Sequence, residues 1–222
     1  MIDTDIGLRN LDVVMGLENR IVYNLVDVVE GKCRIRQALI KDKRYPELCL
    51  LPSAQTRDKD AVTPEQMVAL INELREEFDY ILIDCPPSLG LITLNSFTAS
   101  NSVLIPVQCE YFALEGLGQL LNTINLVKKH LNKEIQIEGA LLTMYDMRTN
   151  LSNQVVKEVK KYFNDKVYKT VIPRNVRLSE APSYGMPITE YDSRSKGAKS
   201  YIKFAREFLK INEEEKKAKH MV

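Results

Sequence analysis

One stretch of the chain predicts a helix that passes directly into a buried strand. Thr63 can cap the helix, Pro64 suits its first position, and Gln66 completes a Thr-x-x-Gln capping box. Apolar residues then recur at helical spacing and form one stripe: Met67, Leu70, Ile71, Leu74 and Phe78. The uninterrupted apolar run 80–83 that follows is typical of a parallel strand covered on both faces, and it ends on Asp84.

The rest of the chain continues this alternation of strands and helices. Further strands are expected at 103–107, 137–144 and 167–172. Further helices are expected at 114–130, 151–163 and 198–211. Because strands that alternate with helices are typical of βαβ units, the sequence predicts an α/β fold. We expect a doubly wound, mostly parallel sheet with helices on both faces.

Composition places the chain among ordinary globular proteins. Hydrophobic residues make up 45% of its 222 residues and charged residues 27%. We expect one domain over residues 1–211, followed by a charged, flexible tail at 212–222. The sequence contains neither a long apolar run nor an opening signal peptide, which favours a cytoplasmic protein. The four cysteines are scattered and show no paired metal-site spacing.

The net charge of +1 hides a basic region in the C-terminal part of the chain. Between Tyr145 and Lys210 there are 14 Lys and Arg residues against 7 Asp and Glu residues. Such a surface can bind phosphate backbones, although an ordinary solvated helical face is equally consistent with the charge alone.

Two groups of carboxylates stand where parallel strands are expected to end. Asp84 follows four apolar residues, the Walker B pattern, in which a carboxylate holds Mg²⁺ directly or through water. The rigid segment CPPSLG comes next, as expected of a loop that responds to a γ-phosphate. Near the start, Asp3 and Asp5 point to the same side of an extended segment. They could position Mg²⁺ or a water molecule, or they could be a solvated pair on a frayed terminus.

These segments together resemble the ParA/MinD family of deviant-Walker ATPases, a class of P-loop ATPases. Residues 1–84 resemble the MinD branch in the segments IDTDIGLRNLDVVMGLENRIVYNLVDVVEG and LLPSAQTRDKDAVTPEQM. Residues 85–211 resemble the Soj (ParA) branch in CPPSLGLITLNSFTASNSVLIPVQCEYFALEGLGQLLNT, MYDMRTNLSNQVVKEVKKYF and VIPRNVRLSEAPSYG. The resemblance covers all of the chain except the tail.

The resemblance implies ATP and Mg²⁺ as cofactors and assigns residues to them. It identifies Asp84 as the carboxylate that holds Mg²⁺ through water. It identifies Asp5 as the carboxylate that orients the attacking water, with Asp3 nearby. Pro173 and Asn175 match the loop that holds the adenine. If this assignment holds, Asp5 and Asp84 lie at the carboxyl ends of neighbouring strands.

The resemblance also implies macromolecular partners. Arg148 and Arg177 match arginines that contact DNA in Soj-like relatives, although ordinary surface charge is the alternative for both. Non-specific DNA, a ParB-like partner and an ATP-dependent homodimer are therefore expected, in a chromosome-partitioning ATPase located on the nucleoid. A membrane partner is not expected, because residues 212–222 carry almost no apolar face.

The phosphate-binding segment of the family has no counterpart in these residues. The family places a KGGxGKT-type P-loop before its Asp-x-Asp segment, and no G-x-x-x-x-G-K-[ST] occurs in the sequence. We therefore expect a fold truncated at its N-terminus and an isolated chain that neither binds nor hydrolyses ATP. Two alternatives stay open: a MinD-type regulator of the division site, and a non-enzymatic remnant that binds DNA or a partner weakly.

Overall fold

The computed structural model describes residues 1–7, 10–55 and 61–220, and these form two compact units. Unit 1 consists of Met1–Ser102, Leu120–Gln136 and Tyr184–Met186. Unit 2 consists of Val103–Gln119, Ile137–Ser183 and Pro187–Val222. The boundary between the units does not follow residue 84, where the two family resemblances meet, and the single domain over 1–211 stays a prediction.

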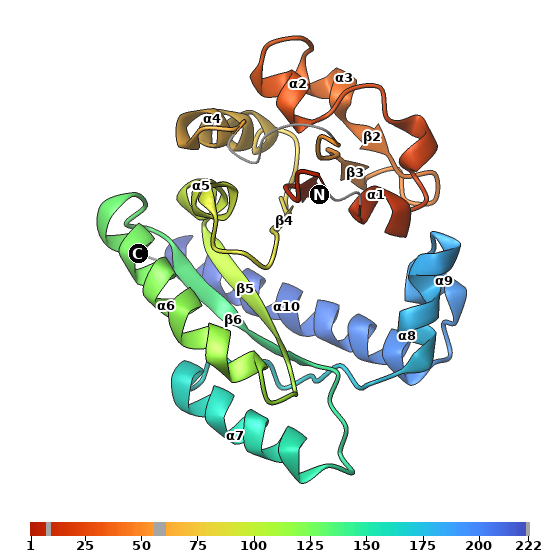
Figure 1. Cartoon of the computed structure of the whole chain (residues 1–222), viewed down its shortest axis with the longest axis vertical. Coiled ribbons are helices and arrows are strands. Elements are labelled where there is room, and N and C mark those ends of the chain that lie inside the picture. The colour runs from red at the N-terminus through yellow and green to blue at the C-terminus, as the bar shows by residue number, and fades with distance from the viewer. Residues whose placement is uncertain (8–9, 56–60, 221–222) are drawn as a thin grey trace. The chain divides into compact units, whose positions relative to one another are not determined.

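Unit 1 contains the N-terminal elements of the chain (Figure 1). They are β1 (Ile2–Asp3), α1 (Leu11–Val14), η1 (Glu18–Arg20), α2 (Leu25–Val29), α3 (Ile35–Ala38), β2 (Ile40–Lys41), β3 (Cys49–Leu50), α4 (Pro64–Leu74), β4 (Ile83–Asp84) and α5 (Leu91–Ala99). The helix α6 (Ala113–His130) starts in unit 2 and ends in unit 1.

The strands of unit 1 lie side by side around β1. β1 pairs with β4 in parallel, with Ile2 opposite Ile83 and Asp3 opposite Asp84. On the other side of β1, Leu51 forms a parallel bridge with Ile2, and β3 pairs antiparallel with β2. The strand order is therefore β2-β3-β1-β4. Because β1 and β4 run in the same direction, their carboxyl ends meet at one edge of the sheet.

The capping box predicted for α4 is present. The Thr63 hydroxyl accepts the N–H of Gln66 at 3.3 Å, and the Gln66 side chain accepts the N–H of Thr63 at 2.9 Å. The predicted apolar stripe of α4 is buried in the core of unit 1: Met67, Leu70, Ile71 and Leu74. The helix signal in the sequence therefore predicted both the start of α4 and the face that it buries.

The prediction of a strand covered on both faces was wrong for residues 80–83. Only Ile83 belongs to β4, and Ile81 and Ile83 pack against the core. The alternate side chains, Tyr80 and Leu82, are 38% and 50% exposed. An apolar run shows that a strand can be buried, but it does not show whether a second layer covers its other face.

The helix α5 had no clear signal in the sequence. Its nine residues are apolar or small on all sides, and six of them are buried. Such a helix lacks the amphipathic period on which sequence prediction relies. α5 packs against α4, so the two helices cover the core of unit 1 together.

Unit 2 contains most of the C-terminal elements. They are β5 (Ser102–Gln108), β6 (Gln136–Thr143), α7 (Asn150–Phe163), α8 (Val176–Glu180), η2 (Ala181–Tyr184), α9 (Ile188–Tyr191) and α10 (Lys196–His220). β5 pairs with β6. The N–H of Gln136 donates to the carbonyl of Asn101 at one end of the pair, and the N–H of Cys109 donates to that of Thr143 at the other. The bonds advance in the same direction along both strands, so the pair is parallel. The strands predicted at 103–107 and 137–144, the helices predicted at 114–130, 151–163 and 198–211, and the α/β class are confirmed.

The strand predicted at 167–172 is not a regular strand. The segment follows β6 in parallel through single bridges, such as that between Ala140 and Val167. In the middle of the segment, the N–H groups of Lys169 and Thr170 donate instead to the Glu207 carboxylate, at 2.7 and 2.9 Å. In a continuous parallel ladder the N–H of Thr170 would donate to the carbonyl of Leu142, which accepts the N–H of Ile172 instead, at 2.8 Å.

The helix α10 packs one face on unit 2 and is longer than the sequence predicted. Phe204, Phe208 and Ile211 contact a core formed by Leu141, Tyr168 and Ile172. The helix starts at Lys196 and continues to His220, past the end that we expected at residue 211. Glu, Lys and Ala dominate the added turns and are strong helix formers, so the helix extends beyond the part that packs on the core.

Candidate functional site

The carboxyl ends of β1 and β4 bring together the acidic residues predicted from the sequence. Asp3 lies directly opposite Asp84 in the parallel pair. Asp5 follows two residues later, and its N–H donates to Asp3 Oδ1 at 2.9 Å. Asp5 and Asp84 therefore lie at the ends of neighbouring strands, as the sequence predicted.

Hydrogen bonds hold the segment after β1 in place. Both the N–H and the hydroxyl of Thr4 donate to the carbonyl of Asp84, at 3.0 and 2.6 Å. Ser53 donates its hydroxyl to the carbonyl of Asp5 at 3.3 Å, and the Asn10 amide donates to Asp5 Oδ2 at 3.4 Å. The segment is thus not a frayed terminus, and that alternative is excluded for residues 3–5.

The carboxylates of this site differ in exposure. Asp3 is 1% exposed and Asp5 is 9% exposed, whereas Asp84 is an exposed residue whose carboxyl is partly desolvated by its neighbours. Burial, with a smaller contribution from the Asp84 carboxylate, raises the pKa of Asp3 to about 6. Desolvation, and secondarily the charge of Asp5, raises the pKa of Asp84 above its ordinary value. Negative charge is therefore crowded here, and a cation would relieve that crowding.

Sequence reasoning missed several residues around this site. Thr4, Asn10 and Ser53 provide the hydrogen bonds described above. Asp12, on α1, is only 2% exposed, and its negative charge contributes to the raised pKa of Asp3. Thr4 lies between the two aspartates that the sequence singled out, whereas nothing in the local pattern marks Asp12 or Ser53.

The chemistry of the site suits a cation that keeps part of its hydration. Among the described residues, no three His, Cys, Asp or Glu side chains are grouped so that they could hold a metal ion by themselves. Mg²⁺ commonly keeps several waters and binds through one or two carboxylates together with phosphate oxygens. The donors present fit such an ion, with Asp84 as the accessible carboxylate.

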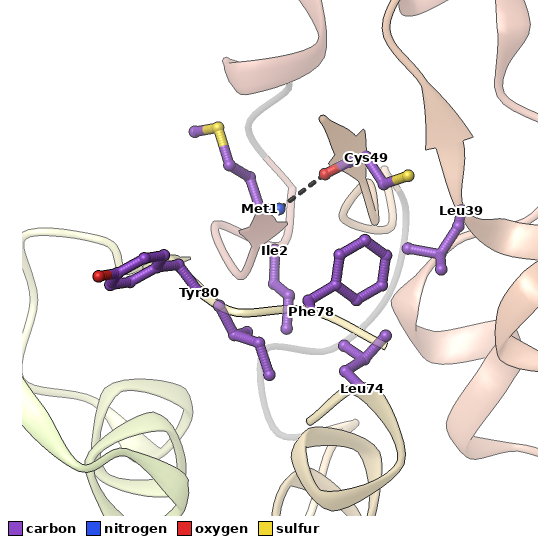
Figure 2. A pocket seen from close by; sticks show the side chains of 8 residues that line it. Met1, Ile2, Leu39, Cys49, Leu74, Phe78 and Tyr80 are labelled. Carbon is purple, nitrogen blue, oxygen red and sulfur yellow. Dashed lines mark hydrogen bonds between the residues drawn. The ribbon is translucent and has the colours of Figure 1, made fainter. Parts of the chain in front are cut away.

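The cavity in unit 1 is a packing gap and not a ligand site. Figure 2 shows it at the amino end of β1, where the N-terminal amine donates to the carbonyl of Cys49 at 2.6 Å. Leu74 and Phe78 also line it, and burial lowers the pKa of the amine. The cavity measures about 20 Å³. Ligand pockets for drug-sized molecules measure roughly 300–1,000 Å³.

The residues assigned to the adenine loop lie in unit 2. Pro173 forms a parallel bridge with Tyr145. The next residue, Arg174, forms an ion pair with Glu110. Asn175 occupies the N-cap position of α8 without capping it by its side chain. The Asn175 Oδ1 atom is buried and has no hydrogen-bond partner among the described residues. A buried acceptor without a donor is costly, so this atom suits a ligand N–H.

The two arginines predicted to contact DNA are exposed, but each is bound to a carboxylate. Arg148 donates to Asp146 through two nitrogens, at 2.9 and 2.7 Å, and these bonds hold the pKa of Asp146 at about 2. Arg177 pairs with Glu180 at 2.8 Å and with Asp192 at 3.6 Å. Their charges are therefore partly neutralised on the protein surface.

In the part of the chain that the structure describes, no helix is both long and apolar enough to cross a membrane.

Comparisons with known proteins agree on one family. An AAA domain model matches residues 1–137. The chain is 54% identical over 203 residues to the sporulation initiation inhibitor protein Soj of Bacillus subtilis, covering 91% of this chain and 74% of that protein. It is 53% identical over 164 residues to the chromosome partitioning protein ParA of Myxococcus xanthus, covering 74% of this chain and 55% of that protein. The septum site-determining protein MinD of Bacillus subtilis is 36% identical over 214 residues, covering 94% of this chain and 76% of that protein.

The chain therefore spans between about half and three quarters of the length of these relatives. The match to Soj is longer than the segment 85–211, so it extends into the part that resembles MinD.

Solved structures show the same relationship. The cell division ATPase MinD of Pyrococcus furiosus superposes with a TM-score of 0.78 at 26% identity, covering 95% of this chain and 84% of that chain. Cobyrinic acid a,c-diamide synthase of Mycobacterium smegmatis, solved with an ATP analogue and magnesium, superposes with a TM-score of 0.72 at 29% identity. That match covers 92% of this chain and 79% of the synthase.

Proposed function

Because the chain belongs to the ParA/MinD family of P-loop ATPases, and its identity to Soj exceeds that to MinD, we propose that it works as a ParA/Soj-type ATPase of chromosome partitioning. In this proposal an ATPase of this type binds ATP with Mg²⁺, forms a homodimer, covers DNA without sequence preference and responds to a ParB-like partner, and this chain carries the carboxylates of its site but not its phosphate-binding segment. Its place is on the nucleoid. The observation that carries the proposal is the pairing of Asp3 with Asp84 at the carboxyl ends of two parallel strands, with Asp5 beside them.

The position of each side chain supports the role that we propose for it. Bound ATP with Mg²⁺ would supply a phosphoryl group for transfer to water. Asp84, exposed at the end of β4, would hold the cation through water. Asp5, held by Asn10, would orient the attacking water. In unit 2, Asn175 Oδ1 would accept a hydrogen bond from the exocyclic amine of adenine, beside Pro173.

A magnesium titration tests the carboxylate site without relying on ATP. We expect Mg²⁺ to raise the melting temperature of the chain at constant ionic strength and pH 7.5. At ten times the dissociation constant the gain is about 1.4 kcal/mol, which corresponds to roughly 3 °C for a chain of this size. Asp84→Asn should abolish the shift. Asp79→Asn, which removes an exposed carboxylate five residues earlier, is the matched control and should keep it. Equal shifts in all three proteins would refute the assignment of Asp84.

Calorimetry tests the nucleotide part of the proposal. The 222 residues contain no G-x-x-x-x-G-K-[ST] segment to surround the phosphates, so we propose that this polypeptide alone gives no saturable heat with ATP and Mg²⁺ and no measurable hydrolysis. A micromolar dissociation constant that disappears in Asp84→Ala would show that these residues bind the nucleotide without that segment.

A further inference from the structure

The helix α10 carries a row of basic residues along one side. The count of Lys and Arg in the C-terminal part of the sequence did not show this arrangement. Its basic residues up to position 210 follow intervals of three and four: Lys196, Lys199, Lys203, Arg206 and Lys210. At 3.6 residues per turn, these five positions lie within an arc of about 80° around the helix. We call this set the α10 basic stripe. All five residues are exposed, and the helical period places them on the side of α10 away from Phe204, Phe208 and Ile211, which pack on the core of unit 2.

The charge of the α10 basic stripe is not neutralised within the described part of the chain. Lys196, Lys199, Lys203 and Arg206 form no ion pair with any described residue. Lys210 lies 3.9 Å from Glu214, at the limit of an ion pair and on the exposed end of the stripe. Such an exposed pair contributes little.

The acidic residue nearest the stripe is bound elsewhere. Glu207 is the sole Asp or Glu between Lys196 and Lys210. Its carboxylate accepts the N–H of Lys169, the N–H of Thr170 and the hydroxyl of Thr170, at 2.7, 2.9 and 2.6 Å. It therefore faces the segment beside β6 and leaves the stripe with an uncompensated positive charge.

We propose that the α10 basic stripe is the principal surface through which this protein contacts the phosphates of duplex DNA, an inference that rests on the DNA binding proposed above. The stripe extends about 21 Å along the helix, the distance covered by about six nucleotides of one strand. Its five cations thus extend along a row of about six phosphates of one strand. Arg148 and Arg177 contribute less, because each must first leave a carboxylate.

The arrangement of α10 favours a duplex over a lipid surface. A helix that lies on a membrane inserts a continuous apolar face next to its cations. The main apolar face of α10, with Phe204 and Phe208, is already packed in the core of unit 2. Outside that face, Tyr201, Ile202 and Leu209 are 38%, 37% and 42% exposed, but they are fewer than the five cations of the stripe. A partner that binds mainly through charge fits this surface better.

The test compares two triple variants that remove the same charge. The stripe variant is Lys199→Gln/Lys203→Gln/Arg206→Gln. The control variant is Lys128→Gln/Lys129→Gln/Lys133→Gln, which replaces three exposed lysines of unit 1. Binding of two short duplexes of unrelated sequence is measured by fluorescence anisotropy between 50 and 200 mM salt. Glutamine preserves helix propensity, and circular dichroism confirms that each variant is folded.

We expect the parent chain to lose roughly a hundredfold in affinity across this salt range, as four phosphate contacts predict, and to bind both duplexes equally. The stripe variant should bind at least tenfold more weakly at 50 mM salt, and its logarithmic salt slope should fall by about 3. The control variant should behave as the parent. If the triple stripe variant does not fold, the single substitutions Lys203→Gln and Arg206→Gln replace it, and each should lower the slope by about 1.

Several results would overturn the inference. If the stripe and control variants bind alike, the stripe does not contact DNA, while the proposed function stands. If Arg148→Ala/Arg177→Ala loses more affinity than the stripe variant, the arginines are the principal surface. If the parent chain binds neither duplex at 50 mM salt, both the inference and the DNA-binding part of the proposed function fail. Stripe-dependent binding to anionic phosphatidylserine vesicles without duplex binding would identify a membrane as the partner instead.

Discussion

Replacing Asp3 by Asn should stabilise the protein at neutral pH. Asp3 is 1% exposed, and its Oδ1 atom accepts the N–H of Asp5 at 2.9 Å. Asparagine retains an oxygen at this position and can accept the same bond. What the substitution removes is the charge, which burial and the Asp84 carboxylate disfavour.

The raised pKa of Asp3 sets the magnitude of this effect. The pKa rises from the ordinary value of 3.8 to about 6 in the folded protein. A difference of that size corresponds to about 3 kcal/mol between the charged and neutral forms. Between pH 4 and pH 6 the folded state binds more protons than the unfolded state, so the free energy of unfolding falls as the pH rises through this range. Above pH 6 the parent chain bears the full free-energy cost of keeping the buried Asp3 carboxylate charged.

Urea unfolding at pH 4, 5 and 7.5 measures the prediction. We expect Asp3→Asn to exceed the parent by about 2 to 3 kcal/mol at pH 7.5 and by only about 0.5 kcal/mol at pH 4, where Asp3 is protonated in the folded state and about half ionised in the unfolded state. Asp79→Asn, at an exposed position, should follow the parent at every pH. Millimolar Mg²⁺ should reduce the advantage of the variant at pH 7.5, because a cation stabilises the charged parent. A variant that is less stable than the parent at pH 7.5, or a difference that does not change with pH, would refute the reasoning.

Three further predictions concern stability and are checked by chemical denaturation. Thr63→Ala should cost about 1 kcal/mol, because it removes the hydroxyl that caps α4, while a cost below 0.3 kcal/mol would show that the cap contributes little. Gly139→Ala should cost about 1–3 kcal/mol, because the new Cβ would lie 2.9 Å from the ring of Tyr168. Gly118→Ala should instead stabilise α6 by about 1 kcal/mol, because no atom lies within 4 Å of the Cβ that it adds. Although burial acts to raise the pKa of Glu207, its hydrogen bonds hold that pKa below the ordinary value of 4.5. The contribution of the Glu207 carboxylate to the free energy of unfolding is present above pH 4.5 and is lost as the pH falls through the folded pKa. Glu207→Gln should therefore destabilise the protein at pH 7, and this destabilisation should disappear in acid. A destabilisation that is the same at both pH values would contradict this account.

The helix α4 and the edge occupied by Asp3 and Asp84 were predictable because their signals are local. A capping box needs only the residues between Thr63 and Gln66, and an apolar stripe needs only the helical period. The position of Asp84 followed from a rule about where parallel strands end. The family resemblance added the roles of the aspartates, which stay predictions.

Other features depended on contacts between residues far apart in the chain. The Glu207 carboxylate, 37 residues beyond Thr170, interrupts the strand expected at 167–172. Leu82 is exposed because the segment 80–83 packs on the core through one face only, with Ile81 and Ile83. No local pattern in the sequence contains that information.

Charge shows the same division between sequence and tertiary structure. The sequence determined how many cations the C-terminal part carries, and the helical period determined which of them share one side of α10. Only the tertiary structure decided which cations are neutralised: Arg148 lies against Asp146, whereas Lys203 has no acidic partner among the described residues. The physical reason is that an ion pair forms over about 4 Å in space, and the fold alone determines which charges come within that distance.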